Sequence, residues 1–216
     1  MDKNLKLTDE HYRYLRQMRS RARDPLLAEL RRETETLGEN AAMIAAEEQG
    51  DFFTILVGAM RVNSALEIGT FTGFSSLCIA RGLAPGGRLL CCDINAEWTA
   101  IARRYWQRAG VSDRIELRLA PAAETLGRLE AGRTFDFVFI DADKLGYDAY
   151  YELVLPRVET GGLIIFDNML SHGGVLRPQN PREEALDALN RKLAVDSRVE
   201  SVLVPIADGL TLCKKK

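Results

Sequence analysis

Beyond residue 64, short apolar runs alternate with stretches of helical periodicity, and this alternation leaves few folds open to the chain. Seven runs are apolar and short enough for strands: residues 65–68, 88–92, 115–119, 135–140, 163–166, 199–204 and 210–213. Helical stretches lie between most of them, at residues 74–81, 97–109, 122–130, 147–155 and 181–193. Such alternation predicts an α/β fold with a mainly parallel sheet and helices on both faces. The last two runs are too close for a crossover helix, so we expect an antiparallel pair joined at Ala207-Asp208-Gly209.

The first 62 residues have no strand-like runs and predict extra helices. Asp24 followed by Pro25 is typical of a helix start, with an N-cap and then proline at the first helical position. We expect further helices over residues 9–20 and 48–60. At 216 residues the chain favours a single domain, in which the helices of residues 1–62 are added to an α/β core of residues 63–216.

Composition excludes several classes of protein. Acidic residues exceed basic ones by 31 − 29 = 2, which argues against a broad nucleic-acid-binding face. No apolar run approaches the ~20 residues that span a bilayer, and the start, Met1 to Lys6, is not followed by the apolar core of a signal peptide. The four cysteines form no zinc-site or C-x-x-C spacing. We therefore expect a cytoplasmic protein with no membrane or nucleic-acid partner.

The segment that follows the first strand is the first candidate for ligand binding, because ligands of open α/β sheets bind at the carboxyl ends of the strands. Gly69 and Gly73 permit a sharp turn, and the helix that follows presents free N–H groups. Phe71 rules out G-x-G-x-x-G, and no P-loop lysine follows. Glu67 would repel a pyrophosphate but attract a cationic ligand. The alternative is a plain strand-to-helix turn with Glu67 exposed.

Candidate ligand-binding residues also follow the second and third strands. Asp93 could accept both hydroxyls of a ribose, unless Asp93 or Asn95 only caps the next helix. After the third strand, small residues around Ala122 leave room for a flat ring. A simple helix start with Pro121 near its first position explains that segment equally well.

The fourth and fifth strands are followed by hard oxygen donors. Asp141, Asp167 and Asn168 together suit Mg²⁺ or a similar divalent ion. The alternative is that these acids cap helices or pair with Lys144. His172, in a glycine-rich loop, is best interpreted as solvent-exposed or substrate-facing.

Taken in order, these motifs resemble the metal-dependent, S-adenosylmethionine-using O-methyltransferases of the caffeoyl-CoA and catechol type. The resemblance runs from about Asp24 to the end of the chain. Its marks are Met43 with Glu48-Gln49-Gly50, the segment 66–75, Cys92-Asp93-Ile94-Asn95, the segments 135–144 and 161–168, and Ala207-Asp208-Gly209. It implies a Rossmann-like methyltransferase fold with a seven-stranded sheet whose last strand is antiparallel.

The resemblance also implies roles for individual residues. The S-adenosylmethionine site would be lined by Met43, Ala45, Glu67, Gly69, Thr70, Gly73, Ser75, Asp93, Ile94, Ala122 and Asp141. Residues 43–45 would cover the methionine part of this cofactor. Asp141, Asp167 and Asn168 would bind Mg²⁺ or another divalent cation (Ca²⁺ or Mn²⁺), and Lys144 would be the base. The expected acceptor is a small phenol with two vicinal hydroxyls, catechol-like or caffeoyl-type, and the expected assembly is a homodimer with contacts from the N-terminal helices.

The sequence departs from the family pattern at two positions, and three rival functions stay open. Ser171 stands where relatives often carry Trp, and Ala120 replaces a common Gly. A nicotinamide-dependent oxidoreductase would require Gly in place of Phe71. A non-catalytic S-adenosylmethionine-binding protein has no need of Asp141, Lys144, Asp167 and Asn168. A metal-dependent hydrolase leaves Glu67, Asp93 and the glycine turn unexplained.

Overall fold

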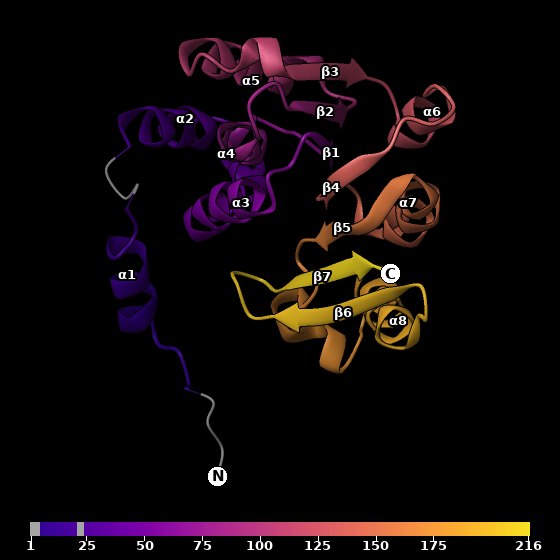
Figure 1. Cartoon of the computed structure of the whole chain (residues 1–216). Coiled ribbons are helices and arrows are strands. Elements are labelled where there is room, and N and C mark those ends of the chain that lie inside the picture. Colours follow the sequence, from indigo (N-terminus) through magenta and orange to yellow (C-terminus); the bar gives the residue numbers. More distant parts are fainter. Residues whose placement is uncertain (1–4, 21–23) are drawn as a thin grey trace.

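A seven-stranded sheet forms the centre of the molecule (Figure 1). The computed structural model describes residues 5–20 and 24–216, so most of the Met1–Lys6 start lies outside the described residues. The strands are β1 (Ser64–Ile68), β2 (Arg88–Asp93), β3 (Ile115–Leu119), β4 (Phe135–Ile140), β5 (Val158–Phe166), β6 (Val199–Val204) and β7 (Leu210–Lys215). Their order is β3-β2-β1-β4-β5-β7-β6, and β7 runs antiparallel to both neighbours. The predicted topology, with its antiparallel last strand, is confirmed.

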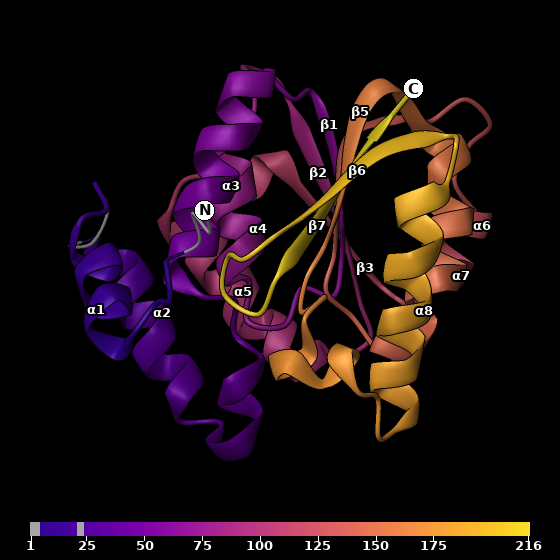
Figure 2. The same ribbon diagram turned by 90° about the horizontal axis from the view of Figure 1, so that it is seen from below.

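Helices cover both faces of this sheet (Figure 2). One face carries α3 (Glu47–Met60), α4 (Phe74–Gly82) and α5 (Ala96–Arg108), and the other carries α6 (Ala122–Gly127), α7 (Tyr147–Val154) and α8 (Pro181–Val195). Alternation along β4 divides the core between the two faces. Phe137 and Phe139 pack with Phe53 of α3, whereas Val138 and Ile140 belong to the cluster on the other side.

The N-terminal helices are bonded to the α4–α5 side of the core. Asp24 caps α2 (Pro25–Glu35) by accepting from the N–H groups of its first turn, and its other oxygen pairs with Arg81 of α4 at 2.7 Å. At the far end of α2, the buried Thr34 hydroxyl donates to the Thr72 hydroxyl at 2.9 Å. Outermost lies α1 (Asp9–Gln17), which buries none of its residues.

Some element boundaries differ from expectation. Strand β5 begins at Val158 rather than Leu163, because Gly161-Gly162 continues the strand instead of breaking it. A shift in the pairing of β4 with β5 between Phe135 and Phe137 accommodates this glycine pair. Helix α6 stops at Gly127, and α1 stops at Gln17. None of the helices in residues 5–20 and 24–216 has the length and apolarity needed to cross a bilayer.

Candidate active site

The residues that follow the strands are joined to one another by main-chain hydrogen bonds. Each bond runs from a residue just beyond one strand to the end of the neighbouring strand: Gly69 N–H to Cys92, Asp141 to Ile68, Asp167 to Ile140 and Ala120 to Asp93, at 2.8–3.1 Å. We call this row the rim. It brings the segments that follow β1, β2, β3, β4 and β5 to one edge of the sheet, as the strand-end rule predicts.

The loop between β1 and α4 depends on two glycines with left-handed backbone. At Gly69 (φ +89°), a Cβ would collide with the Asp141 carbonyl group, so only glycine lets the loop lie against β4. At Gly73 (φ +86°), a Cβ would lie 2.5 Å from that of Ala102, so glycine lets α4 start close to α5. The backbone of this loop therefore lies against the rim on one side and against α5 on the other.

Asp93 orders the same loop. Its Oδ2 accepts from the N–H groups of Thr70 and Phe71 at 2.9 and 2.8 Å, and its Oδ1 accepts from the N–H of Asn95. Asn95 in turn caps α5, as its alternative role predicted. Asp93 is half-buried at the rim and Ile94 beside it is exposed, so both can be reached by a ligand.

Glu67 is completely buried, so its interpretation as an exposed residue at a plain turn is wrong. Cys91 Sγ lies 3.5 Å from its Oε2, while Oε1 has no hydrogen-bond partner among the described residues. Burial raises the pKa of Glu67 to about 8, so the carboxyl is neutral near pH 7. Thr70 Oγ1 is a second buried oxygen without a hydrogen bond within the described chain, and Ser75 nearby is buried. These unpaired atoms fit a polar ligand at this loop.

Asp141, which is partly exposed, and Asp167, which is buried, directly follow the neighbouring strands β4 and β5. Burial, and then the charge of Asp141, raise the pKa of Asp167 to about 7. Burial also raises the pKa of Asp141, and Lys144 opposes that rise. Asn168 has left-handed backbone (φ 57°) and donates its N–H to Asp167 Oδ1 at 2.6 Å. Two mutually repelling carboxylates beside an amide are a donor set that fits a divalent cation, and such an ion would relieve the repulsion.

The two carboxylates alone do not complete a donor set for a divalent cation. Nowhere in the described chain do three His, Cys, Asp or Glu side chains gather in a way that could hold a metal. A cation at the rim would therefore need the Asn168 oxygen, water or substrate oxygens in addition to the two carboxylates.

Lys144 is bonded directly to this pair. Its Nζ lies 2.6 Å from Asp141 Oδ1 and 3.1 Å from the Ala142 carbonyl oxygen, and 4.9 Å from the centre of the Tyr147 ring. Its side chain is only 12% exposed. The structural ion pair with Asp141 considered as an alternative is present, and the role of Lys144 as a base stays a prediction.

The remaining predicted residues lie around the rim. Met43 ends a 3₁₀ turn (Gly38–Met43) and is half-exposed, whereas Ala45 and Ala122 are buried. We call residues 43–46 the strap. Arg31 of α2 holds it by donating to the Ala45 carbonyl at 2.9 Å. A second 3₁₀ turn (Ser171–Leu176) lies at the same end of the sheet (Figure 2). It carries His172, whose side chain is 86% exposed.

Sequence reasoning assigned no role to three residues that touch this site. Gln49 of α3 lies beside Asp167, the Tyr147 hydroxyl donates to the Asp167 carbonyl at 3.2 Å, and Asp208 Oδ1 accepts from the His172 N–H at 2.6 Å. Gln49 and Asp208 both stand inside motifs that marked the resemblance. Their position in those motifs could have indicated a role at the site. The strand-end rule did not select them, because neither lies directly after a strand that forms the rim.

The fold and the rim together define a class of protein. An open sheet of this strand order, with a glycine loop after β1 and an acid after β2, is the architecture of the class I S-adenosylmethionine-dependent methyltransferases. Residues 17–216 match the family described as O-methyltransferase, and the chain belongs to this family.

Individual relatives agree with this assignment. The chain is 44% identical to the "Probable caffeoyl-CoA O-methyltransferase 2" of Dictyostelium discoideum, over 82% of this chain and 79% of that protein. It is 36% identical to the "Caffeoyl-CoA O-methyltransferase" of Eucalyptus gunnii, over 99% and 90% respectively. The structure of an O-methyltransferase from Bacillus cereus in complex with SAH superimposes with a TM-score of 0.86, at 30% identity over 94% of this chain and 96% of that one. The protein is thus an S-adenosylmethionine-dependent O-methyltransferase, and the oxidoreductase and hydrolase alternatives fall away.

Proposed function

We propose that this enzyme methylates one of two vicinal hydroxyls on a small catechol-like or caffeoyl-type molecule, with a divalent cation such as Mg²⁺ held by Asp141, Asp167 and Asn168. The observation that carries the proposal is the position of Asp141 and Asp167 on neighbouring strand ends of the rim, with Lys144 bonded to Asp141. The names of the relatives support the acceptor class. A bound divalent ion lowers the pKa of a hydroxyl and fixes its orientation.

The residues around the pair would position the reactants and move the proton. Lys144 would leave Asp141 and lose its ammonium proton to solvent, and the neutral amine would then accept the proton of the reacting hydroxyl. The hydroxyl oxygen then forms its bond to the methyl carbon as the carbon–sulfur bond breaks, and the electron pair stays on sulfur. Alignment of oxygen, carbon and sulfur supplies a large part of the acceleration.

The cofactor site in this proposal lies between the strap and the first two strand ends. Asp93 holds the ribose, and Ala122 lies near the adenine. Gly69, Thr70, Gly73 and Ser75 of the β1–α4 loop and its helix start, with Glu67 beneath them, line the methionine end under Met43 and Ala45. Ile94 and Asp141 complete the lining.

The deciding experiment is an assay of methyl transfer to caffeate and to caffeoyl-CoA, with Mg²⁺ or with a chelator, read by product mass. We expect methylated product only with the cation. Asp167→Ala should abolish both the cation dependence and most of the activity, and Asp187→Ala, which removes a half-buried acid of α8 that pairs with Arg191, should behave as wild type. Normal turnover of Asp167→Ala in chelator would show that the cation site is wrong.

We also propose a single methyltransferase domain over residues 1–216 that works as a cytoplasmic homodimer. Helix α1 leaves Tyr14 and Leu15 exposed, and its C-cap residue Met18 is also exposed; helical spacing places the three on one side as an apolar stripe suited to a second copy of the chain. Cys91, Cys92 and Cys213 are buried and form no disulfide among the described residues, which fits a reducing compartment.

A further inference from the structure

The segment that contains α1 makes its polar contacts with the rest of the molecule through one side chain. Helix α1 buries none of its own residues. Among residues 5–20, only Arg19 makes a hydrogen bond or an ion pair with a described residue outside that segment. Arg19 is largely buried, with 12% of its side chain exposed. Arginine is seldom buried unless its charge is paired, so its partners indicate what this contact holds in place.

Arg19 joins the last turn of α1 to the first turns of α3. Its Nε donates to the Arg16 carbonyl, at the end of α1, at 2.9 Å. Its terminal nitrogens donate to the carboxylate and the carbonyl of Glu47, and to Asp51 Oδ2 at 3.0 Å. Asp51 is as little exposed as Arg19, and hydrogen bonds between a guanidinium and carboxylates are strong and geometrically specific. The position of α1 is therefore tied to residues 47–51 of α3.

The same part of α3 holds the end of the strap. The last residue of the strap, Ala46, is the N-cap of α3, and Glu47 directly follows it. Arg31 of α2 contacts both sides of this junction, because its Nε lies 3.4 Å from Glu47 Oε1 and its Nη1 donates to the Ala45 carbonyl at 2.9 Å. Arg31 thus holds the strap directly, whereas Arg19 holds the residue to which the strap is joined.

The start of α3 also lies against the start of α4. A Cβ at Gly50 would lie 2.7 Å from the Phe74 ring, so glycine allows the two helices to approach each other at this point. Phe74 directly follows Gly73 of the β1–α4 loop, and the guanidinium carbon of Arg31 lies 5.2 Å from the centre of its ring. A shift of the first turns of α3 would therefore disturb both the strap and the loop that line the proposed cofactor site.

We infer that Arg19 is a positioning residue that links the attachment of α1 to the affinity for S-adenosylmethionine. The inference rests on the proposed placement of the strap over the cofactor. While Arg19 holds Glu47 and Asp51, the start of α3 and the strap are ordered before the cofactor arrives, so binding requires less further ordering. Loss of Arg19 leaves the largely buried Asp51 without its cation, and the cofactor must then order the strap as it binds.

The test measures binding of S-adenosylhomocysteine by calorimetry in the presence of a chelator, so that neither the cation nor the acceptor affects the result. We expect Arg19→Met to weaken this binding by at least about fivefold, the lower end of the usual coupling between two sites. Arg31→Met should also weaken it, because Arg31 holds the strap directly. Thermal unfolding without ligands checks that each variant is folded.

A second measurement reports the order of the strap itself. The N–H groups of Ile44 and Ala46 are hydrogen-bonded to Ala41 and Gln49 at 3.2 and 2.6 Å, so their exchange with deuterated water is slow while the strap is ordered. In the ligand-free protein, Arg19→Met should speed exchange in the peptide that contains residues 43–46. A general loss of stability would instead speed exchange throughout the core strands.

Two further variants examine the charge of Arg19 and its partner. Arg19→Lys keeps the charge but not the planar fork, so it should bind S-adenosylhomocysteine more tightly than Arg19→Met and less tightly than the wild type. Asp51→Ala removes a partner of Arg19 that lies outside the strap, and it should weaken binding in the same direction. Both variants keep the test decisive if Arg19→Met fails to fold.

Arg108→Met is the matched control. It removes a two-bond ion pair in which Arg108 of α5 contacts Glu29 of α2 at 2.8 and 2.6 Å. This pair also joins an N-terminal helix to the core, but it involves neither α3 nor the strap. Arg108→Met should therefore leave the affinity for S-adenosylhomocysteine and the exchange of residues 43–46 unchanged.

Each unfavourable result has a distinct meaning. If Arg31→Met weakens binding but Arg19→Met and Asp51→Ala do not, the strap covers the cofactor and the inference is overturned. If Arg108→Met weakens binding as much as Arg19→Met, any loosening of the N-terminal helices has this effect, and the inference is again overturned. If neither Arg19→Met nor Arg31→Met weakens binding, the proposed place of the strap and the inference fail together, while the cation site and the acceptor class are unaffected.

Discussion

Glu67 shows how burial changes the chemistry of a single carboxyl. As an ionised acid beside a glycine loop, it would attract a cationic cofactor through its charge. Full burial raises its pKa to about 8 instead, so in the ligand-free enzyme it is a neutral hydrogen-bonding group near pH 7. Its contribution to stability should therefore depend on pH in a direction opposite to that of an ion-paired acid.

We predict that Glu67→Gln gains stability relative to the wild type as pH rises. The unfolded chain loses the Glu67 proton near the ordinary value of 4.5, whereas the folded chain keeps it to about 8. The free energy of unfolding of the wild type therefore falls between these pH values, by at most about 1.4 kcal/mol per pH unit, and glutamine avoids this loss. Urea unfolding of both ligand-free proteins measures the difference. A difference that stays constant between about pH 5 and pH 8 would contradict the burial of an ionisable group here.

One substitution should distinguish the role of Lys144 as a base from its role as an ion-pair partner. Lys144→Met should lower kcat by a factor of about 10² to 10⁴, the usual contribution of a positioned proton acceptor, and should change the pH profile. Affinity for S-adenosylhomocysteine should change little. Lys192→Met, which removes a lysine of α8 that pairs with Asp148 and Glu152, is the control and should keep full activity. Retained turnover with an unchanged pH profile in Lys144→Met would leave Lys144 only its structural ion pair.

At the scale of elements, the approach of α4 to α5 depends on the absence of a side chain at Gly73. Gly73→Ala adds both left-handed strain and a Cβ 2.5 Å from that of Ala102. We predict a loss of more than about 2 kcal/mol in the free energy of unfolding. Gly86→Ala isolates the strain, because Gly86 has a similar φ of +79° and open space around its Cβ position. It should cost only about 1 kcal/mol, and equal losses in the two variants would show that packing against α5 is unimportant.

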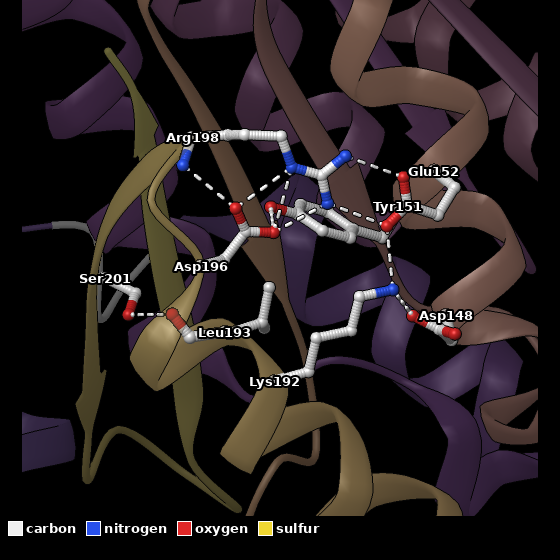
Figure 3. Close-up of polar contacts among 8 residues, drawn as sticks. All are labelled: Asp148, Tyr151, Glu152, Lys192, Leu193, Asp196, Arg198 and Ser201. Atoms are coloured by element: carbon white, nitrogen blue, oxygen red, sulfur yellow. Dashed lines mark hydrogen bonds and ion pairs between the residues drawn. The ribbon is translucent and has the colours of Figure 1, made fainter.

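A network of charges joins α7, α8 and the residue that precedes β6 (Figure 3). The two helices lie on the face of the sheet opposite α3 (Figure 2). Arg198 pairs with Glu152 of α7 at 2.8 Å and with Asp196 at 2.6 Å, and the Tyr151 hydroxyl donates to Asp196 at 2.9 Å. Hydrogen bonds from Arg198 hold the pKa of Glu152 down to about 2 and that of Asp196 well below its usual range. Both carboxyls therefore stabilise the fold only while they are ionised.

We predict that Arg198→Met destabilises the protein by about 1 kcal/mol near neutral pH. The folded-state pKa values are depressed, so the network is fully stabilising above the ordinary values of about 4 and is lost as pH falls toward 2. The difference between wild type and variant in chemical unfolding should shrink over that range. Arg191→Met, which breaks an exposed pair within α8, should show no such dependence, and a difference that persists unchanged in acid would contradict the network.

At the scale of the whole molecule, the apolar stripe of α1 predicts how two copies meet. Leu15→Glu places a charge in the stripe and should shift the protein from dimer to monomer in sedimentation. Arg13→Glu changes charge on the other side of the same helix and should leave the assembly unchanged. A wild-type protein that sediments as a monomer at all concentrations would remove the stripe as a dimer contact.

Sequence was most informative where one local pattern decides one local structure. The apolar runs located all seven strands, and the strand-end rule placed Gly69, Asp93, Asp141 and Asp167 on one rim. Sequence alone could not predict the burial of Glu67 or the proximity of Gln49 to Asp167, because each depends on segments that are far apart in the chain. The length of β5 was missed for a local reason, since a pair of glycines inside a strand looks like a turn.

The rim has a further consequence for how enzymes of this kind diversify. Its hydrogen bonds join main chain to main chain, so the spacing of Gly69, Asp141 and Asp167 does not depend on which side chains surround them. The turn that carries His172 and the helices that carry the strap are attached outside this row. Substitutions in these outer segments can therefore change which acceptor binds while the main-chain positions of the rim stay the same. Acceptor specificity can then evolve without a change in the reaction that the enzyme catalyses.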